Sequence, residues 1–331
     1  MQESITTPSE TPWVKVISKY RNPSNFRSWW QLANTFIPYV MLWILMVYSL
    51  SVSYWLTLAI ALPAAGLVVR LFIIFHDCGH GSFFKSKRLS AGIGYVIGVL
   101  TFTPYIRWHH AHHIHHQTAG NLDKRGIGDV WTLTVNEYAT LSKRKRLIYR
   151  IYRNPFIMFG LGAALMFLIN NRFTRRSFSW KDRFNVYLTN LGILVIASVL
   201  SYFVGWKQYL MIQLPVMYFA SVAGVYMFYV QHQFEDVHWY HDKEWDFKSV
   251  ALMGSSYFKL PAILQWFTGN IGFHHIHHLS FLIPNYYLEK CHNESATFRN
   301  VKPITLYQSF RTLRLRLWNE ETGKLVGFHA R

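Results

Sequence analysis

The run YWLTLAIALPAAGLVVRLFIIF from Tyr54 to Phe75, followed without a break by HDCGH from His76 to His80, decides what kind of fold this chain adopts. The run is apolar and long enough to cross the hydrocarbon core of a bilayer as a helix, which takes about 20 residues. His76 and His80 lie four positions apart, so on a continuing helix they share one face and can chelate one metal cluster. The sequence therefore predicts a membrane helix that ends in metal ligands.

The composition of the whole chain agrees with a membrane protein. It has 331 residues, of which 51% are hydrophobic and 18% aromatic, more than an ordinary soluble domain needs. Lys and Arg outnumber the acidic residues by 34 to 16 and cluster between the apolar runs. This pattern is typical of a protein that lies against an anionic lipid leaflet, whereas nucleic-acid binding requires a basic face on a soluble domain.

Two further features favour chemistry on the cytosolic side. Cys78 and Cys291 are the only cysteines, which excludes a disulfide framework and a thiolate cage for zinc or an iron–sulfur cluster. The first residues, MQESITTPSETP, lack the basic and apolar regions of a secretory signal, so we expect a disordered lead-in.

Six apolar stretches are candidates for membrane segments. Four of them approach the length of a spanning helix, about 17 to 25 residues, and two, the third and fourth along the chain, are marginal. The six run from Leu32 to Leu50, Tyr54 to Phe75, Ala91 to Ile106, Phe156 to Ile169, Val186 to Val204 and Tyr209 to Val230.

Clusters of Lys and Arg predict the orientation, because these residues concentrate on the cytoplasmic side of a membrane. Basic residues precede the first stretch, follow the second, and stand on both flanks of the third and fourth. We therefore expect two hairpins of transmembrane helices, with the short stretches as interfacial or re-entrant helices. The predicted fold is an all-α integral protein of the cell membrane, with a cytoplasmic N-terminal segment (1–31), a membrane domain (32–230) and a cytoplasmic helical cap (231–331). Every histidine cluster then faces the cytoplasm and contributes to one di-metal site.

Thirteen of the 17 histidines fall in four short places. These are His76 and His80; six residues between His109 and His116; His232; and His274, His275, His277 and His278. In HHIHH from His112, and again in HHIHH from His274, the first, fourth and fifth residues share a helix face while the second points away. With the pair after the second apolar run and His232, this gives nine imidazoles, enough for two metal ions with room left for water or dioxygen.

Spacing alone does not decide which histidines of the second cluster lie on the face that binds metal. His109, His112, His113 and His116 also form a helical stripe, which is an alternative to the frame that begins at His112.

Carboxylates near the histidines can be read in two ways. Glu-x-x-His occurs at Glu235 and at Glu289, as in carboxylate-bridged di-iron bundles, but those bundles need further Glu residues from two other helices. We instead expect Asp77, Glu235 and Asp236 to accept hydrogen bonds from ligand imidazoles and to set their tautomers.

These motifs resemble the three histidine boxes of the membrane fatty-acid desaturases. The boxes are HDCGH at His76, HHIHH from His112 followed by QTAGNLDKRGIGDVW, and HHIHH from His274 between GNIGF and LSFLIPNYYL. YVQHQFED around His232 is similar to the segment that carries a further histidine ligand in that family. The resemblance covers nearly the whole chain, favours the frame beginning at His112, and is greatest to the acyl-lipid desaturases of bacilli, including LTVNEY, YRNPFIMF and LQWFTGN.

The resemblance implies a non-haem di-iron centre. Such a centre uses dioxygen and two electrons per turnover to remove two hydrogens from adjacent methylenes, here of a phospholipid acyl chain near its fifth carbon. The ligands it implies are His76, His80, His112, His115, His116, His232, His274, His277 and His278.

Electrons are expected from a separate ferredoxin or flavodoxin, because the chain carries no fused haem domain of the cytochrome b type. Candidate docking faces for this acidic carrier are the stripe Arg311, Arg314 and Arg316 and the basic loop Lys143–Arg153. Contact of the same charges with lipid phosphates is the competing explanation.

Two other functions remain to be compared. A histidine-box hydroxylase or ketolase acting on an alkane or carotenoid would share the metal site, and only the flanking segments favour a desaturase. A membrane metal transporter would need ionisable residues inside its spans, which here contain almost none apart from Arg70.

Overall fold

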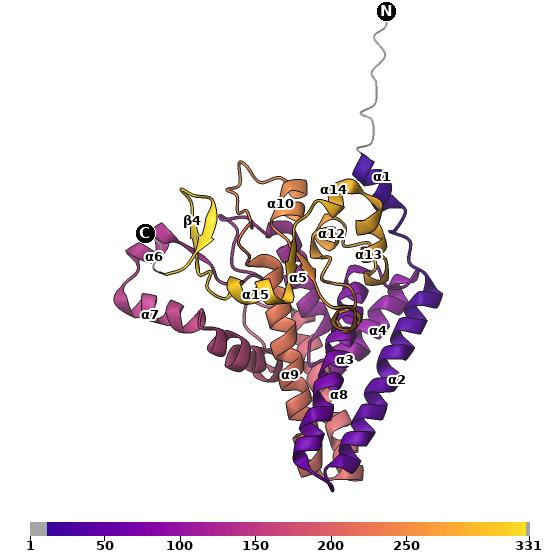
Figure 1. The fold of residues 1–331 in the computed structure, drawn as a ribbon. Helices are drawn as coiled ribbons and strands as arrows, with labels where there is room; N and C mark the ends of the chain where they lie inside the picture. The colour runs from indigo at the N-terminus through magenta and orange to yellow at the C-terminus, as the bar shows by residue number, and fades with distance from the viewer. Residues whose placement is uncertain (1–11, 329–331) are drawn as a thin grey trace, which may run out of the picture.

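The structure is a computed structural model that describes residues 12–328, and it shows a narrow bundle of long helices joined to a broader cap (Figure 1). Four helices are long and apolar enough to cross a membrane: α2 (Asn25–Ser49), α3 (Tyr54–His80), α8 (Trp180–Val204) and α9 (Trp206–His232). This confirms four apolar helices of spanning length. The predicted disordered lead-in lies outside the described residues except for Pro12.

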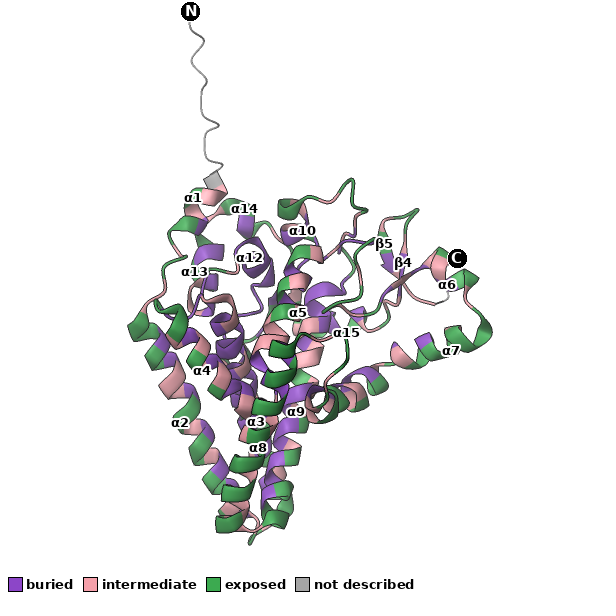
Figure 2. Ribbon diagram, turned by 180° about the vertical axis from the view of Figure 1, so that it is seen from behind, coloured by how far each residue is buried: buried purple, intermediate pink, exposed green. Residues whose placement is uncertain are grey.

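Helix α3 is the centre of the bundle. It packs against α2, α4 and α9, and 61% of its most apolar window is buried, compared with 11% for α8. Exposed apolar side chains cover the outer faces of α2 and α8, as the green segments of Figure 2 show. An apolar surface of this extent is unfavourable in water and suits contact with lipid. Helix α3 ends at His80 and is followed by Gly81, whose φ of 66° favours glycine, so His76 and His80 lie at the end of the helix.

Two pairs of shorter helices are sharply bent. Helix α4 (Lys87–Leu100) meets α5 (Tyr105–Thr118) at 104°, and α7 (Lys143–Tyr152) meets the irregular helix over 156–172 at 66°. The latter consists of η1 (Phe156–Gly162), η2 (Leu165–Ile169) and η3 (Asn170–Arg172). The predicted stretch Ala91 to Ile106 is therefore not one helix, because Pro104 disfavours helical geometry in the residue before it. Each bent pair is apolar enough to be one broken span or a re-entrant loop, so the re-entrant or interfacial placement remains a prediction.

The cap combines short helices with two small sheets. Its helices are α1 (Pro12–Ser18), α6 (Val135–Thr140), α10 (Phe247–Met253), α11 (Ala262–Phe267), α12 (His274–Leu279), α13 (Asn285–Glu294), α14 (Ala296–Arg299) and α15 (Leu306–Thr312). One sheet has the order β1 (Leu133–Thr134), β4 (Leu317–Asn319), β5 (Lys324–Val326), and β2 (Tyr257–Lys259) pairs in parallel with β3 (Pro303–Thr305). The all-α prediction is wrong in this detail, because strands of two or three residues carry no detectable alternation.

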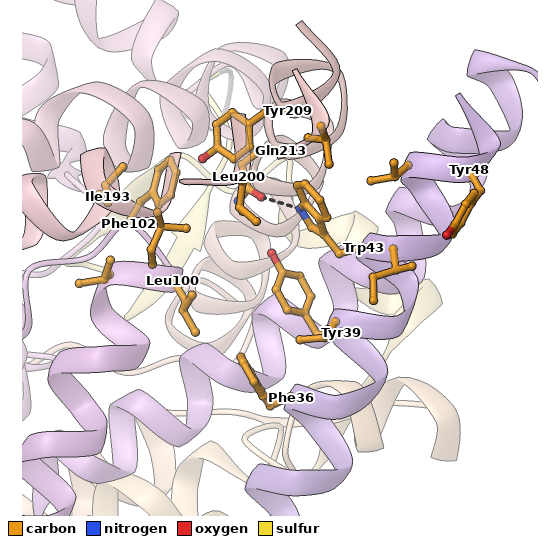
Figure 3. A pocket seen from close by; sticks show the side chains of 16 residues that line it. Phe36, Tyr39, Trp43, Tyr48, Leu100, Phe102, Ile193, Leu200, Tyr209 and Gln213 are labelled. Carbon is orange, nitrogen blue, oxygen red and sulfur yellow. Dashed lines mark hydrogen bonds between the residues drawn. The ribbon is translucent and has the colours of Figure 1, made fainter. Parts of the chain in front are cut away.

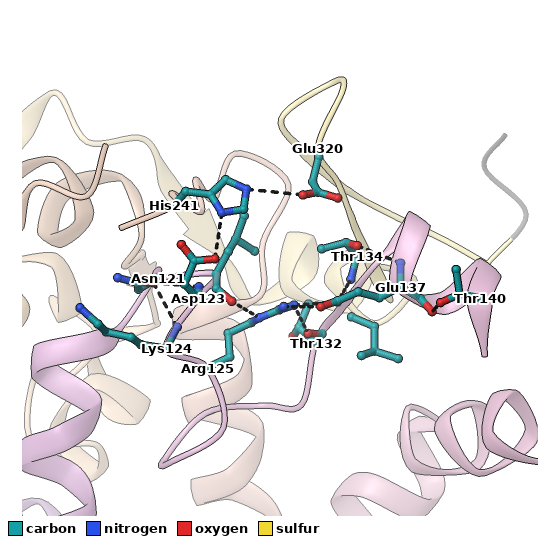
Figure 4. Close-up of polar contacts among 12 residues, drawn as sticks. Asn121, Asp123, Lys124, Arg125, Thr132, Thr134, Glu137, Thr140, His241 and Glu320 are labelled. Carbon is teal, nitrogen blue, oxygen red and sulfur yellow. Dashed lines mark hydrogen bonds and ion pairs between the residues drawn. The ribbon is translucent and has the colours of Figure 1, made fainter. Parts of the chain in front are cut away.

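Charged side chains tie four segments of the cap together (Figure 4). Nδ1 of His241 lies 3.0 Å from a carboxylate oxygen of Asp123, and its Nε2 lies 3.5 Å from Glu320. Arg125 pairs with Glu137 at 2.6 Å. The hydrogen bond to Asp123 raises the pKa of His241. The network therefore holds the loop at 121–125 against the segments around His241 and Glu320.

Candidate metal centre

Four helices bring the predicted histidines to the junction of the bundle and the cap. The first box lies on the last turn of α3, and His232 is the last residue of α9. The second box lies on α5, whose bend relative to α4 changes the direction of the chain at Pro104, and the third box forms most of α12. Boxes that are far apart in sequence therefore meet in one volume.

The described residues contain two groups of side chains whose ligand atoms converge closely enough to hold a metal ion. In each group these atoms lie within 4.8 Å of one another. The first group is His76, His80, His112, His116 and His277, and the second is His115, His232, His274 and His278. Together they are the nine histidines selected from the sequence. All are buried except His80, which is half-buried.

The Nε2 atoms within each group point at one another. Nε2 of His116 lies 3.1 Å from Nε2 of His112 and 2.9 Å from that of His277. Nε2 of His232 lies 3.1 Å from that of His115 and 3.0 Å from that of His274. A neutral imidazole has one N–H and one lone pair, so converging Nε2 lone pairs repel when Nδ1 carries the proton. A shared cation would convert this repulsion into coordination.

The spacing of these nitrogens is compatible with a shared ion in each group. A metal–imidazole bond of about 2.1 Å places neighbouring nitrogens about 3.0 Å apart at right angles and about 3.4 Å apart at tetrahedral angles. The nearest pairs lie 2.9 to 3.1 Å apart and all ligand atoms of a group lie within 4.8 Å, distances that ligands of one shared ion can have. Groups of five and four imidazoles also leave positions open on a six-coordinate ion. The residues therefore fit two iron ions, for which imidazole is a suitable ligand.

Burial keeps these imidazoles in the form that binds metal. Desolvation, and secondly the neighbouring imidazoles, hold the pKa of His112 and His116 well below the usual range. The same causes lower the pKa of His274, His277 and His278. Since metals bind the neutral ring, no proton has to be displaced from these five side chains near neutral pH.

Each group has one imidazole held by a carboxylate. Nδ1 of His76 lies 2.9 Å from Oδ1 of Asp77 in the first group, and Nδ1 of His115 lies 2.7 Å from Oδ1 of Asp129 in the second. Nδ1 is then the donor and Nε2 keeps its lone pair for a metal. Asp77 was selected from the sequence, whereas Asp129 was missed, although it lies in the GIGDVW segment that follows the second box.

The structure does not place the carboxylates of Glu235 and Asp236 beside the clustered imidazoles. Both side chains are exposed, and Asp236 accepts a hydrogen bond from Nζ of Lys302 at 2.8 Å. Among the hydrogen bonds of residues 12–328, none joins either carboxylate to a clustered imidazole. The reason is that the chain turns away after α9 ends at His232, so nearness in sequence to that histidine does not place the carboxylates beside it.

The remaining box histidines point elsewhere. His113 is exposed and lies 3.0 Å from the Gln117 side-chain amide, and His109 belongs to neither group, so the frame beginning at His112 is the one that converges. Nε2 of His275 lies 3.1 Å from Nδ1 of His292, and burial with this neighbour lowers the pKa of His275 to about 3. Neither Glu-x-x-His motif contributes a carboxylate to the two groups.

Comparison with known proteins decides the family. The family model described as fatty acid desaturase matches residues 51–304. A fatty acid desaturase of Bacillus subtilis (strain 168) is 48% identical over 330 residues, which is 100% of this chain and 94% of the relative. This chain belongs to the fatty acid desaturase family. The resemblance seen in the boxes is thereby confirmed, and the desaturase is an oxidoreductase.

More distant relatives also match this desaturase. An sn-1 acyl-lipid omega-3 desaturase (ferredoxin) of Nostoc sp. (strain 36) is 26% identical, over 75% of this chain and 69% of its own. The omega-3 fatty acid desaturase, endoplasmic reticulum, of Vigna radiata var. radiata is 28% identical, over 72% and 65% respectively.

The basic residues of the desaturase divide into exposed and buried ones. Arg311 and Arg314 are exposed and Arg316 is half-buried. Arg153, at the end of the basic loop, is fully buried and donates hydrogen bonds to the side chain of Gln233 at 2.9 Å and to the carbonyl of Leu315 at 3.0 Å. Arg153 is therefore a structural residue of the cap and cannot contact a partner.

An apolar cavity of about 580 Å³ lies among the membrane helices of the desaturase (Figure 3). It is lined from α2, α4, α8 and α9, and by Phe102. Its polar groups include Gln213, which accepts a hydrogen bond from the Trp43 indole at 3.2 Å. Val99 lines the cavity and is next to Gly98 in the sequence. A Cβ atom on Gly98 would lie 3.2 Å from the ring of Phe75, the residue before His76. Gly98 therefore packs against α3 next to the first box, while the cavity itself is lined by residues of other elements.

Proposed function

We propose that this protein is an acyl-lipid desaturase that uses dioxygen and two iron ions to introduce a double bond into a membrane phospholipid acyl chain. The observation that carries the proposal is the pair of buried histidine groups at the ends of apolar helices of spanning length. This location puts the site where an acyl chain can reach it from the bilayer.

The reaction balances with dioxygen and two external electrons: –CH2–CH2– + O2 + 2 e⁻ + 2 H⁺ gives –CH=CH– + 2 H2O. Iron, when bound, supplies the redox chemistry that attacks an unactivated methylene. The protein contributes nine imidazoles, the carboxylates of Asp77 and Asp129 that orient two of them, and a buried surrounding that excludes bulk water.

The apolar cavity supports an alkyl substrate. Its lining is mostly hydrocarbon and aromatic, which suits an acyl tail and offers little to a polar ligand. We assign the tail of the substrate to this cavity, with the reacting carbons nearer the histidine groups. The resemblance to the desaturases of bacilli further suggests a phospholipid as the carrier and a double bond near the fifth carbon.

The orientation and electron supply follow from the same proposal. The histidine groups and the cap would face the cytoplasm, where a ferredoxin or flavodoxin is available; the Nostoc relative is named as a ferredoxin-dependent enzyme. Arg311 lines a second cavity of about 380 Å³, together with Ser256. The backbone of Ser256 is hydrogen-bonded to those of Gln231 and His275, each adjacent to a clustered histidine. A carrier bound there would be within a short distance of the proposed irons.

Charge reversal tests this docking face. Changing the exposed Arg311 and Arg314 to Glu should slow turnover with purified ferredoxin while the protein stays in the membrane, because association with the acidic carrier weakens. Changing the exposed Lys85 and Lys87, which lie outside both candidate docking faces, to Glu is the matched control for net charge. Equal turnover of the first variant and the wild type would remove the arginines from the donor site.

Lipid analysis tests the function itself. The chain is expressed in a bacterium that lacks such unsaturated lipids, and acyl methyl esters are analysed by mass spectrometry after derivatising the double bonds. We expect a new unsaturated species that is lost in His277→Ala and kept in His113→Ala, whose side chain is exposed and outside both groups. Iron-loaded protein that makes hydroxylated alkanes or carotenoids instead would support the hydroxylase or ketolase alternative.

A further inference from the structure

A line of buried polar groups connects the interior of the bundle to the five-histidine group. Arg70 on α3 donates from Nε to Oγ1 of Thr35 on α2 at 3.0 Å, and Thr35 donates to the carbonyl of Gln31 at 2.6 Å. Arg70 and Asp77 lie two turns apart on the same side of α3. All of these residues are buried. Arg70, the charged residue that the membrane segments otherwise leave unexplained, is therefore one end of this line.

Asn285 connects the line to the metal centre. Nε2 of Gln31 donates to Oδ1 of Asn285 at 2.8 Å. Asn285 in turn donates twice to Oδ2 of Asp77, from its backbone N at 2.6 Å and from Nδ2 at 2.8 Å. The other oxygen of Asp77 faces Nδ1 of His76, and Nε2 of His76 has no hydrogen-bond partner within residues 12–328.

The chemistry of these groups permits only one arrangement. The backbone N–H of Asn285 is a donor, so Oδ2 of Asp77 is an acceptor, and the side-chain amide must turn its NH2 toward that oxygen. Its Oδ1 then faces α2, where Gln31 must present its own NH2. Each amide thus sets the orientation of the next. The result is a carboxylate fixed on both oxygens, beside an imidazole that can donate only through Nδ1.

We infer that Asn285 is a positioning residue of the five-histidine site, and that Gln31 orients it. Asn285 holds Asp77 so that His76 directs Nε2 into the site. This inference rests on the proposed metal centre. It extends that proposal by assigning a function to residues on α2 and α13 that, within residues 12–328, form no hydrogen bond with a clustered histidine.

The second histidine group provides an internal comparison. Its carboxylate, Asp129, lies 2.7 Å from Nδ1 of His115 through Oδ1, but its buried Oδ2 has no hydrogen-bond partner in the described part of the chain. Of the two carboxylates, Asn285 is hydrogen-bonded to Asp77 and, among the described residues, not to Asp129. Loss of the Asn285 amide should therefore weaken one metal ion of the two and leave the other unchanged.

Metal affinity at the two sites tests the inference without relying on turnover. Wild type, Asn285→Ala, Asn285→Asp and Gln31→Met are loaded with iron under anaerobic conditions and titrated with a competing chelator, while bound iron per chain is measured by mass spectrometry. Partners of ligand histidines typically change metal affinity by about 10- to 100-fold. We expect a loss of this size for one ion in Asn285→Ala, a larger loss in Asn285→Asp, where two carboxylates would face each other, and a smaller loss in Gln31→Met.

Two controls separate positioning from a general effect on folding. Gln213→Met removes another buried amide, at the opposite end of α9 from His232, and should leave both ions bound as in the wild type. Adding Asn285→Ala to His277→Ala, which disables the first site, should have no further effect on the remaining ion. Adding it to His278→Ala should weaken the remaining ion as much as it does in the wild type.

The outcomes distinguish failure of this inference from failure of the proposed metal centre. Wild-type protein that binds no iron would overturn the metal centre and the inference together. If the wild type binds two ions and Asn285→Ala weakens both equally, or neither, the inference alone is overturned. Selective loss of one ion supports it.

Discussion

Removing the metal from the purified desaturase is expected to lower its melting temperature by about 15 °C. The nine ligand imidazoles converge only in the folded chain, so metal binding stabilises the folded state over the unfolded one. A site filled at about 1,000 times its dissociation constant contributes about 4 kcal/mol, so the two groups give about 8 kcal/mol. In a chain of this size about 1 kcal/mol corresponds to about 2 °C.

The assay is thermal unfolding in detergent, followed by the fluorescence of the 13 tryptophans. Iron-loaded protein, chelator-stripped protein and stripped protein reloaded with iron are compared, and the iron content of each is measured. His116→Ala should behave as partly stripped, because it removes one ligand of the first group, whereas His113→Ala should match the wild type. Equal melting temperatures for protein of verified high and low iron content would refute the reasoning.

Three further outcomes are expected from side chains away from the histidine groups. Arg153→Met should destabilise the folded protein by about 3 kcal/mol, because it leaves buried acceptors unpaired, whereas Lys145→Met on the exposed side of α7 should have no measurable effect on thermal unfolding. Pairing with Asp123 raises the pKa of His241 in the folded protein. The pair therefore stabilises the cap below the pKa of about 6.5 that His241 has in the unfolded chain, and this stabilisation is lost as the pH rises through the higher pKa of the folded state. Trypsin cleavage of the loop at 121–125 should therefore accelerate over this range relative to His241→Gln, and parallel profiles would contradict the pairing. Burial raises the pKa of the Cys291 thiol to about 12, so maleimide at neutral pH should label it only after unfolding; rapid labelling of the native protein would show that the packing of α13 is wrong.

The sequence predicted the spans and the nine clustered histidines because both depend on residues that are close together in the sequence. An apolar run of sufficient length is read directly, and the i, i+3, i+4 spacing selects one face of a short helix wherever that helix is later placed. The choice between the His109 and His112 frames is different. It depends on which face of α5 meets α3 and α12, and only tertiary structure or family resemblance provides that.

The carboxylates show that closeness in sequence does not predict which side chains meet in the folded protein. Asp77 was found because it lies inside the first box, but Asp129 is 14 positions after His115 and approaches it only because the loop folds back. Glu235 and Asp236 were selected for being close to His232 in sequence, yet the end of α9 separates them from it. The burial of Arg153 was also not predictable, because nothing in a run of basic residues distinguishes the one that is buried.

Both histidine groups take ligands from α12, which contributes His277 to the first and His274 and His278 to the second. During synthesis, neither group can therefore be completed until the ribosome has passed residue 278, by which time all four long apolar helices have been made. Metal acquisition is thus a late event in biogenesis, after membrane insertion. A chain that stops before α12 would lack one of the five ligands of the first group and two of the four ligands of the second.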